Sequence, residues 1–177
     1  MNLIGVPLNS VATRIYQGST HGFASANFHS KVDGINGTLT VIKSTTGNIF
    51  GGFTMINWGL SATYYTDPSA FIFSLVNKMN YSSLAQNNKQ PIANSVYTHP
   101  LYGPTFGGGH DIHVADQSNL HMNSFTNFGH TYALNNLTLF NSWNLTIQKS
   151  FLAGGYNFQT VEIEVYASKY IFILITV

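Results

Sequence analysis

Apolar and polar residues alternate along most of this chain, and this period of two restricts its fold more than any other feature. In the segment 38–44, Leu39 and Val41 fall on one face of an extended chain, and Ile42 falls on the other. Successive side chains of a β-strand point to opposite faces, so this pattern predicts a strand. The segment 70–76 is apolar on both faces, which predicts a central strand covered on each side.

A hairpin follows from the residues after the first of these strands. The segment 45–48 is a turn, in which Gly47 and Asn48 are able to take positive φ, and a second apolar strand runs from 49 to 55. Gly51-Gly52 lies inside that second strand, where glycine marks a bulge or a close approach of another chain segment. The two strands are therefore expected to pair antiparallel.

Helix-forming sequence is scarce. Ser25–Val32 predicts about two helical turns with Ser25 as the N-cap, and Asp33-Gly34 ends them. A second weak helix is expected within residues 2–14. Several short strands with few helices favour a β-sandwich of two antiparallel sheets with a few short flanking helices over a barrel. Two long polar segments are expected to be surface loops with short strands, namely 77–94 and 117–149.

The composition excludes several classes of function. Only 7% of the 177 residues are charged, against roughly 25% in an average soluble protein. The seven Lys and Arg residues stand singly along the chain, so the clustered cations that bind nucleic acid or an anionic membrane surface are missing. There is no Cys, which rules out disulfides, thiolate metal sites and thiol catalysis.

The two ends of the chain predict neither a signal peptide nor a membrane-spanning helix. The first eight residues have no basic segment, so a signal peptide is not expected. The apolar segment Tyr170–Val177 is far shorter than the ~20 residues of a membrane-spanning helix. Together with the absence of Cys, these features favour a cytoplasmic location with no membrane span.

A series of motifs in fixed order resembles the TLDc domain. The resemblance runs from about Val11 to Tyr166 without large gaps. It rests on Tyr16, Ser19–Phe23, Phe28-His29, Asp33-Gly34, Thr38–Lys43, Asn48–Phe53, Asp67–Leu75, Phe106–Gly109, Phe158 and Val161–Tyr166.

The resemblance implies a β-sandwich with short helices, which agrees with the alternation pattern. It divides the chain into a poorly matched segment 1–10, a TLDc-like domain 11–167 and an apolar tail 168–177. Members of the family are linked to oxidative-stress resistance, and several bind the vacuolar proton pump. The family brings no accepted catalytic residues or cofactor, so none is assigned. Many relatives have Cys where this chain has Val32, so a thiol-based antioxidant role is excluded.

The segment His110-Asp-Ile-His113 has the residue types of a zinc site. On a strand, however, His110 and His113 are expected on opposite faces, with Asp111 and His113 sharing one. We therefore predict no metal site, while ion binding by these three residues stays open.

Glu162 and Glu164 share one face of an alternating strand, at a spacing that also suits paired catalytic carboxylates. We interpret them as the solvated face, with Val161, Ile163 and Val165 inward. If this face is a docking surface, replacing both carboxylates with Lys would abolish partner capture and leave the melting temperature nearly unchanged. The pair Ser19 and His21 is interpreted as part of a turn, not as a nucleophile and its base.

Three functions remain open from the sequence. The leading hypothesis is a non-enzymatic protein-interaction domain whose partners include subunits of the vacuolar proton pump. The alternatives are a metal- or carboxylate-dependent hydrolase and a carbohydrate-binding sandwich. A deep pocket holding His and Glu would favour the hydrolase, and a flat aromatic platform would favour the sugar. Exposed tyrosines such as Tyr64, Tyr65 and Tyr97 suit either a protein interface or sugar stacking.

Overall fold

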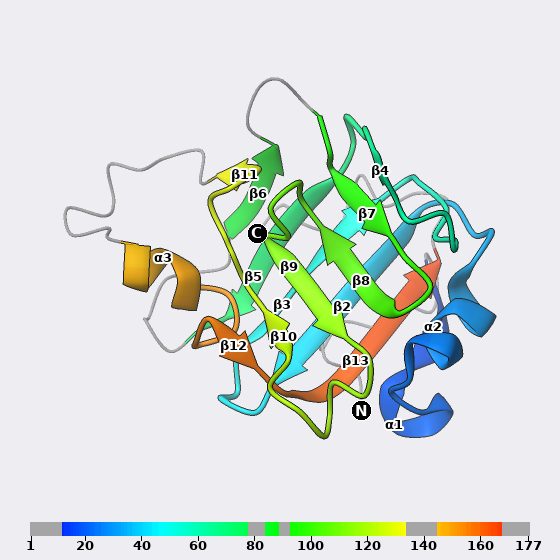
Figure 1. Ribbon diagram of the computed structural model, residues 1–177, viewed down its shortest axis with the longest axis horizontal. Coiled ribbons are helices and arrows are strands. Elements are labelled where there is room, and N and C mark those ends of the chain that lie inside the picture. Colours follow the sequence, from blue (N-terminus) through cyan, green and yellow to red (C-terminus); the bar gives the residue numbers. More distant parts are fainter. Residues whose placement is uncertain (1–11, 78–83, 89–92, 134–144, 168–177) are drawn as a thin grey trace.

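The computed structural model describes residues 12–77, 84–88, 93–133 and 145–167. The described strands form two antiparallel sheets that lie face to face, with short helices at the sides (Figure 1). The predicted β-sandwich is confirmed. One sheet has the order β1 (Thr13–Gln17), β13 (Thr160–Ala167), β2 (Thr38–Ser44), β3 (Ile49–Thr54), β5 (Phe71–Val76), β6 (Leu84–Asn88), β11 (Tyr132–Ala133). The other has the order β12 (Asn157–Phe158), β10 (Ser124–Phe125), β9 (Ile112–Ala115), β8 (Tyr102–Phe106), β7 (Val96–Thr98), β4 (Thr63–Tyr65).

The predicted hairpin is the pair β2 and β3 at the middle of the first sheet. Ile42 belongs to the core between the two sheets, while Leu39 and Val41 belong to a smaller cluster on the sheet's other face. Gly47 has φ +92°, as expected for the turn. Asn48 does not have a positive φ; its buried side chain instead donates a hydrogen bond to the Leu152 carbonyl oxygen at 2.9 Å.

Gly51 and Gly52 mark a close approach. A Cβ atom at Gly52 would lie 2.7 Å from the Phe106 ring of the opposite sheet, so a larger residue there would push the sheets apart. A Cβ atom at Gly51 would collide with the Thr40 carbonyl oxygen. Both glycines are therefore required by packing in the centre of the sandwich.

The helices flank the sheets. The helix α2 (Ser25–Val32) is confirmed, and it ends at Asp33 and Gly34, which has φ +76°. Its N-cap is Ala24, so the prediction of Ser25 as the cap was wrong. Ser25 already has helical geometry, and its backbone N–H donates to the Asp116 carboxylate at 2.7 Å. The other helices among the described residues are α1 (Gly18–His21) and α3 (Leu145–Ser150).

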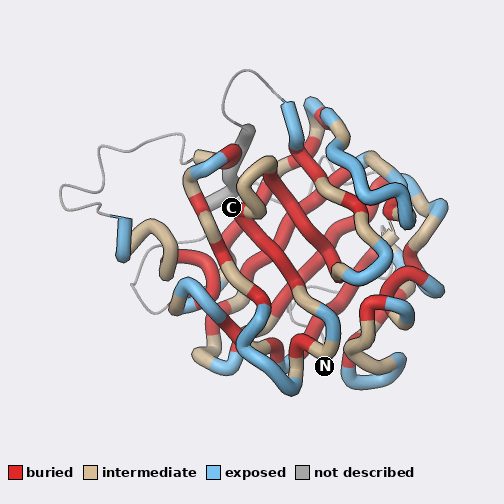
Figure 2. Tube along the Cα trace, viewed as in Figure 1, coloured by how far each residue is buried: buried red, intermediate tan, exposed pale blue. Residues whose placement is uncertain are grey.

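The core lies between the sheets, where the central strands are buried and the exposed stretches are turns and edges (Figure 2). A chain of edge-to-face rings, Phe28, Trp58 and Phe106, connects α2 to the second sheet with centroid separations of 5.5 Å. Such pairs add about 0.5–1.5 kcal/mol beyond the area they bury. The short α2 is thereby docked on the sandwich, as a helix of two turns must be.

Several sequence predictions fall at the ends and in the long polar segments. Residues 13 and 14 of the expected helix 2–14 are in strand β1, and residues 2–11 lie outside the described residues. The tail 168–177 lies outside them too. Within 117–149, expected as a loop with short strands, the last residues form α3. Of the described helices, none is long and apolar enough to cross a membrane.

Candidate functional site

Asp111 anchors a loop. Its carboxylate is fully buried and accepts hydrogen bonds from the backbone N–H groups of the segment 129–132, at 2.9–3.2 Å. Burial raises the pKa of Asp111 to about 6, against the opposing effect of these donors. The expectation that Asp111 shares a solvated strand face with His113 is therefore wrong, because Asp111 precedes β9 and turns toward the loop.

His110 and His113 lie on the same side, and the prediction of opposite faces was wrong. Their ring centroids are 5.4 Å apart, with the planes inclined by 21°. His110 has φ +56° and lies before β9, so strand alternation does not apply to it. Burial, with His110 and His99 nearby, lowers the pKa of His113 to about 4, and burial also lowers that of His110.

No three His, Cys, Asp or Glu side chains gather into a possible metal site in the part of the chain that the structure describes. Asp111 is the carboxylate among the three candidate ligands His110, Asp111 and His113. It already accepts hydrogen bonds from four backbone N–H groups. The absence of a functional metal stays a prediction.

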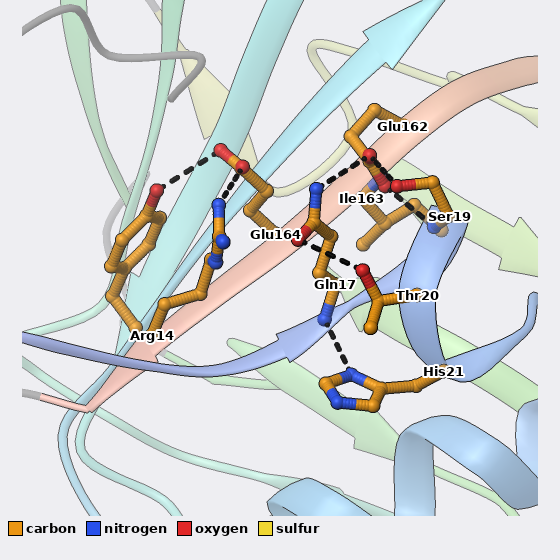
Figure 3. A network of polar contacts seen from close by, with 9 residues as sticks. Arg14, Gln17, Ser19, Thr20, His21, Glu162, Ile163 and Glu164 are labelled. Atoms are coloured by element: carbon orange, nitrogen blue, oxygen red, sulfur yellow. Dashed lines mark hydrogen bonds and ion pairs between the residues drawn. The ribbon is translucent and has the colours of Figure 1, made fainter. Parts of the chain in front are cut away.

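The side chain of Glu162 is buried, with 7% of the residue exposed, and it connects β13 to the helix α1. Its carboxylate accepts hydrogen bonds from the Ser19 N–H at 3.0 Å, the Ser19 hydroxyl, the Gln17 amide at 3.1 Å and the Ile163 N–H at 3.0 Å (Figure 3). Burial acts to raise the pKa of Glu162, but these donors outweigh it, and the pKa lies below its ordinary value.

Glu164 is fully buried as well. It forms an ion pair with Arg14 of β1 at 2.7 Å and accepts from the Tyr166 hydroxyl at 3.0 Å. A register shift between Thr160 and Glu162 leaves Val161 49% exposed. The interpretation of Glu162 and Glu164 as a solvated face, with Val161 inward, was therefore wrong: the strand β1 and the helix α1 cover the carboxylates.

Ser19 and His21 have separate partners. Ser19 binds Glu162, whereas Nδ1 of His21 accepts from the Gln17 N–H at 3.0 Å (Figure 3). Both residues lie in the four-residue helix α1, which follows β1 directly, and that they are not a nucleophile and its base stays a prediction.

The outer face of the second sheet carries a continuous set of aromatic rings. Ile112 and Val114 of β9 point into the core, so the alternate side chains of this sheet point outward. Cross-strand pairing places Tyr64 opposite Tyr97, and His113 opposite Phe125. We name the set the aromatic face; it comprises Tyr64, Tyr97, His99, Tyr102, His110, His113, Phe125 and Tyr156.

Neighbouring rings of the aromatic face are in contact across the width of the sheet. Centroid separations are 4.5 Å between Tyr64 and Tyr97, 5.2 Å from Tyr97 to His110, 4.8 Å from His113 to Phe125 and 5.6 Å from Phe125 to Tyr156. The two outermost tyrosines, Tyr64 and Tyr156, are 39% and 42% exposed, while His113 at the centre is buried.

Polar groups are placed at both ends of the aromatic face. The Tyr64 hydroxyl donates to the Gly108 carbonyl oxygen at 3.0 Å and lies 3.2 Å from Nε2 of His110. At the other end, Nζ of Lys149 lies 4.8 Å from the Tyr156 ring centre, a cation–π contact. The face is therefore aromatic along its length, with histidine rings at its centre and polar contacts at both ends.

A comparison with family models gives one description for this sandwich: the TLDc domain model matches residues 8–169, nearly the whole chain. The chain belongs to the TLDc family. A comparison with curated proteins gives no match. The matched range contains the predicted domain 11–167, whose exact boundaries stay a prediction.

One open cavity of the TLDc domain is formed by the loop after β3. It has a volume of about 480 Å³ and is lined by Asn36, Met55, Ile56, Asn57, Trp58, Gly59, Leu60, Ser61 and Tyr65. This lining contains neither His nor Glu, so the cavity is not the pocket that would favour a hydrolase.

The sequence predicted only part of the aromatic face. It indicated Tyr64 and Tyr97 as exposed tyrosines, but it did not predict that they lie beside His99, His110 and His113. The rings come from separate strands, and their spacing along the sequence follows no period. Only the order of strands in the second sheet makes them neighbours.

Proposed function

We propose that this TLDc domain is an interaction module that binds a protein partner through the aromatic face and carries out no reaction. The observation that carries the proposal is the face itself, with its buried centre and exposed tyrosines at both ends. Protein interfaces have such a composition at their core, rich in Tyr and Phe and poor in charge. The eight residues of the face include no carboxylate.

The ring geometry favours a protein over a sugar. Stacking of a sugar needs ring faces that lie flat and open. Here Tyr102 meets His113 at 84° and Tyr64 meets Tyr97 at 48°, so the rings form an uneven surface on that side, while Phe125 and Tyr156 are more nearly parallel at 25°. Side chains of a protein partner can pack into such an uneven surface, whereas a sugar ring needs a flat one.

Family membership suggests the partner. Because the resemblance links TLDc domains to the vacuolar proton pump, we propose a cytoplasmic subunit of that pump as the partner and oxidative-stress resistance as the setting. A cytoplasmic location of the chain belongs to the same proposal.

The absence of catalysis is also proposed. Glu162 and Glu164, the carboxylates that suited a hydrolase, have their oxygens engaged by Ser19, Gln17, Arg14 and Tyr166. A carboxylate held in this way stabilises the fold, and it is not positioned to attack or protonate a substrate.

The test measures the affinity of the domain for the purified cytoplasmic sector of the pump. Replacing Tyr64 and Tyr156 with Ser removes the exposed rings at the two ends of the face. We expect a loss of at least about tenfold in affinity, because tyrosines are enriched among the interface residues that contribute most of the binding free energy. Leu60→Ser is the matched control, since Leu60 is 59% exposed on the cavity loop, and it should bind like the wild type.

The outcomes separate the hypotheses. Unchanged affinity in the double variant, or an equal loss in Leu60→Ser, would contradict binding through the aromatic face. Binding to an oligosaccharide panel that is lost with Tyr64 and Tyr156 would replace the protein partner with a carbohydrate.

A further inference from the structure

The first sheet carries a second apolar surface, on the side that faces away from the core between the sheets. We name it the outer apolar face, and it comprises Leu39, Val41, Phe53, Phe73 and Tyr166. These side chains come from β13, β2, β3 and β5, which are neighbours in the sheet. Each of them is at most 4% exposed. The outer apolar face is therefore buried almost as completely as the core.

Strand pairing arranges part of this face as a row across the sheet. Tyr166 lies opposite Leu39, and Leu39 lies opposite Phe53. On the next strand Phe71 continues the row, and its ring stacks on that of Phe53 with the centroids 5.5 Å apart. The row begins on β13 beside Ala167, the last residue that the structure describes. The chain thus leaves the described domain at one end of an apolar row.

The outer apolar face needs a covering layer. In the part of the chain that the structure describes, the apolar side chains packed around this face come from the same sheet or from Ala12 next to it. The described helices lie at the sides of the sandwich (Figure 1). Side chains within one layer shield one another only laterally, yet Val41 is 0% exposed. Because an apolar sheet face is buried against another layer, a segment outside the described residues must supply that layer.

The segment 168–177 has the composition and the length of such a layer. After Lys169 it continues as Tyr170–Ile175, six apolar residues in succession. Four strands with a spacing of about 4.8 Å make the face about 14 Å wide. Ten residues measure about 15 Å as a helix and about 33 Å when extended. Starting from Ala167, the segment is therefore long enough to cross the face in either conformation.

Charge and composition distinguish this segment from the others outside the described residues. The outer apolar face is uncharged, so burying a Lys over it would cost free energy. The segments 78–83 and 89–92 each begin with Lys. The segments 1–11 and 134–144 are uncharged, but Asn and Ser interrupt their apolar runs. The run Tyr170–Ile175 has no such interruption.

We propose that the segment 168–177 packs over the outer apolar face and is its cover within the same chain. The inference goes beyond the proposed function and does not depend on it, because the aromatic face belongs to the other sheet. The TLDc match ends at residue 169, so most of the cover lies outside the matched range. A domain that loses the cover exposes a second apolar surface and associates with itself.

A first experiment locates the segment in the full chain. Because the sequence has no Cys, Leu174→Cys carries a spin label at this position alone. The label should strongly broaden the methyl NMR signals of Leu39 and Val41. Leu101 is the control, since it is 66% exposed in the turn between β7 and β8, and its signals should keep their intensity. Unchanged signals of Leu39 and Val41, or equal broadening at Leu101, would overturn the proposal.

Two further arms test the other possible covers. In a mixture of isotope-labelled chains without the spin label and spin-labelled chains without the isotope, Leu39 and Val41 should stay sharp. Broadening in that mixture would assign the cover to a second copy and overturn the proposal. A label at Asn2→Cys that broadens Leu39 and Val41, when the label at Leu174→Cys does not, would assign the cover to the segment 1–11 instead.

A second experiment removes the cover by substitution. Ile173→Asp places a charge within the apolar run, so it should lower the melting temperature and increase the binding of a dye that reports apolar surface. Thr176→Asp is the matched control, because the same charge stands at a polar position, and its effects should be smaller. A melting temperature and dye binding of Ile173→Asp equal to those of Thr176→Asp would contradict the cover. If Ile173→Asp does not fold, the spin-label experiment decides.

Discussion

At the scale of single residues, the acidic side chains of this chain act as internal anchors. Asp67 is 3% exposed, and its carboxylate accepts from the Thr54 hydroxyl at 2.6 Å, the Met55 N–H at 2.7 Å and the Ser69 N–H at 2.9 Å. Burial acts to raise the pKa of Asp67, but these donors lower it overall. Asp111 and Glu162 hold neighbouring backbone segments in the same way. A chain with few charges thus uses them to order its turns.

The first prediction concerns Asp67→Asn. The amide can accept on one side only, so a donor is left without an acceptor, and the free energy of unfolding should fall by about 1–3 kcal/mol at neutral pH. The native pKa lies below the unfolded value of about 3.9, so the charge stabilises above that pH and the contribution is lost as the pH falls. Urea unfolding of both proteins should therefore differ at neutral pH and converge in acid. Equal free energies of unfolding of the wild type and Asp67→Asn at neutral pH would contradict a stabilising role of the Asp67 carboxylate.

At the scale of elements, the edge formed by β1, α1 and β13 depends on buried carboxylates. Glu162 binds Ser19, which lies 143 residues earlier, and Glu164 binds Arg14, which lies 150 residues earlier. From local sequence, alternation predicted β13 and the inward direction of Ile163 and Val165, but it misplaced Val161. It could not show that the face of Glu162 is covered, because the covering residues come from the opposite end of the chain.

The second prediction replaces the earlier expectation for this edge. The double variant Glu162→Lys, Glu164→Lys should lose several kcal/mol of stability, since it leaves the donors that bind the two buried carboxylates without acceptors, at about 1–3 kcal/mol for each such group. Val161→Lys is the matched control on the same strand, because Val161 is 49% exposed and should change stability little. Thermal unfolding gives the comparison. A melting temperature of the double variant close to that of Val161→Lys would show that the carboxylates are not structural.

At the scale of the whole molecule, the two sheets and the aromatic face differ in how far a sequence can predict them. The hairpin β2–β3 follows from local alternation and from the glycine turn, and the central strand β5 follows from apolar residues on both of its faces. The aromatic face needs the strand order of the second sheet, in which β4 lies at one edge and β12 at the other. His110 was also misplaced, because its positive φ breaks the alternation that the sequence suggests.

A third prediction concerns metals in the whole fold. Cys is absent, Asp111 is engaged by backbone N–H groups, and the rings of His110 and His113 stack on each other. Thermal melts of the domain with and without a chelator should therefore coincide. A fall of several degrees on chelation that zinc restores would contradict this prediction.

The central claim is that the domain binds a protein through the aromatic face. Amide hydrogen exchange of the unaltered domain, free and with the pump sector, tests it most directly because each segment reports its own protection. We predict slower exchange in the bound state at β7, β8 and the turn 99–102, with the cavity loop 55–61 unchanged. Protection confined to the loop 55–61 or to α1, with no change at β7 and β8, would contradict it.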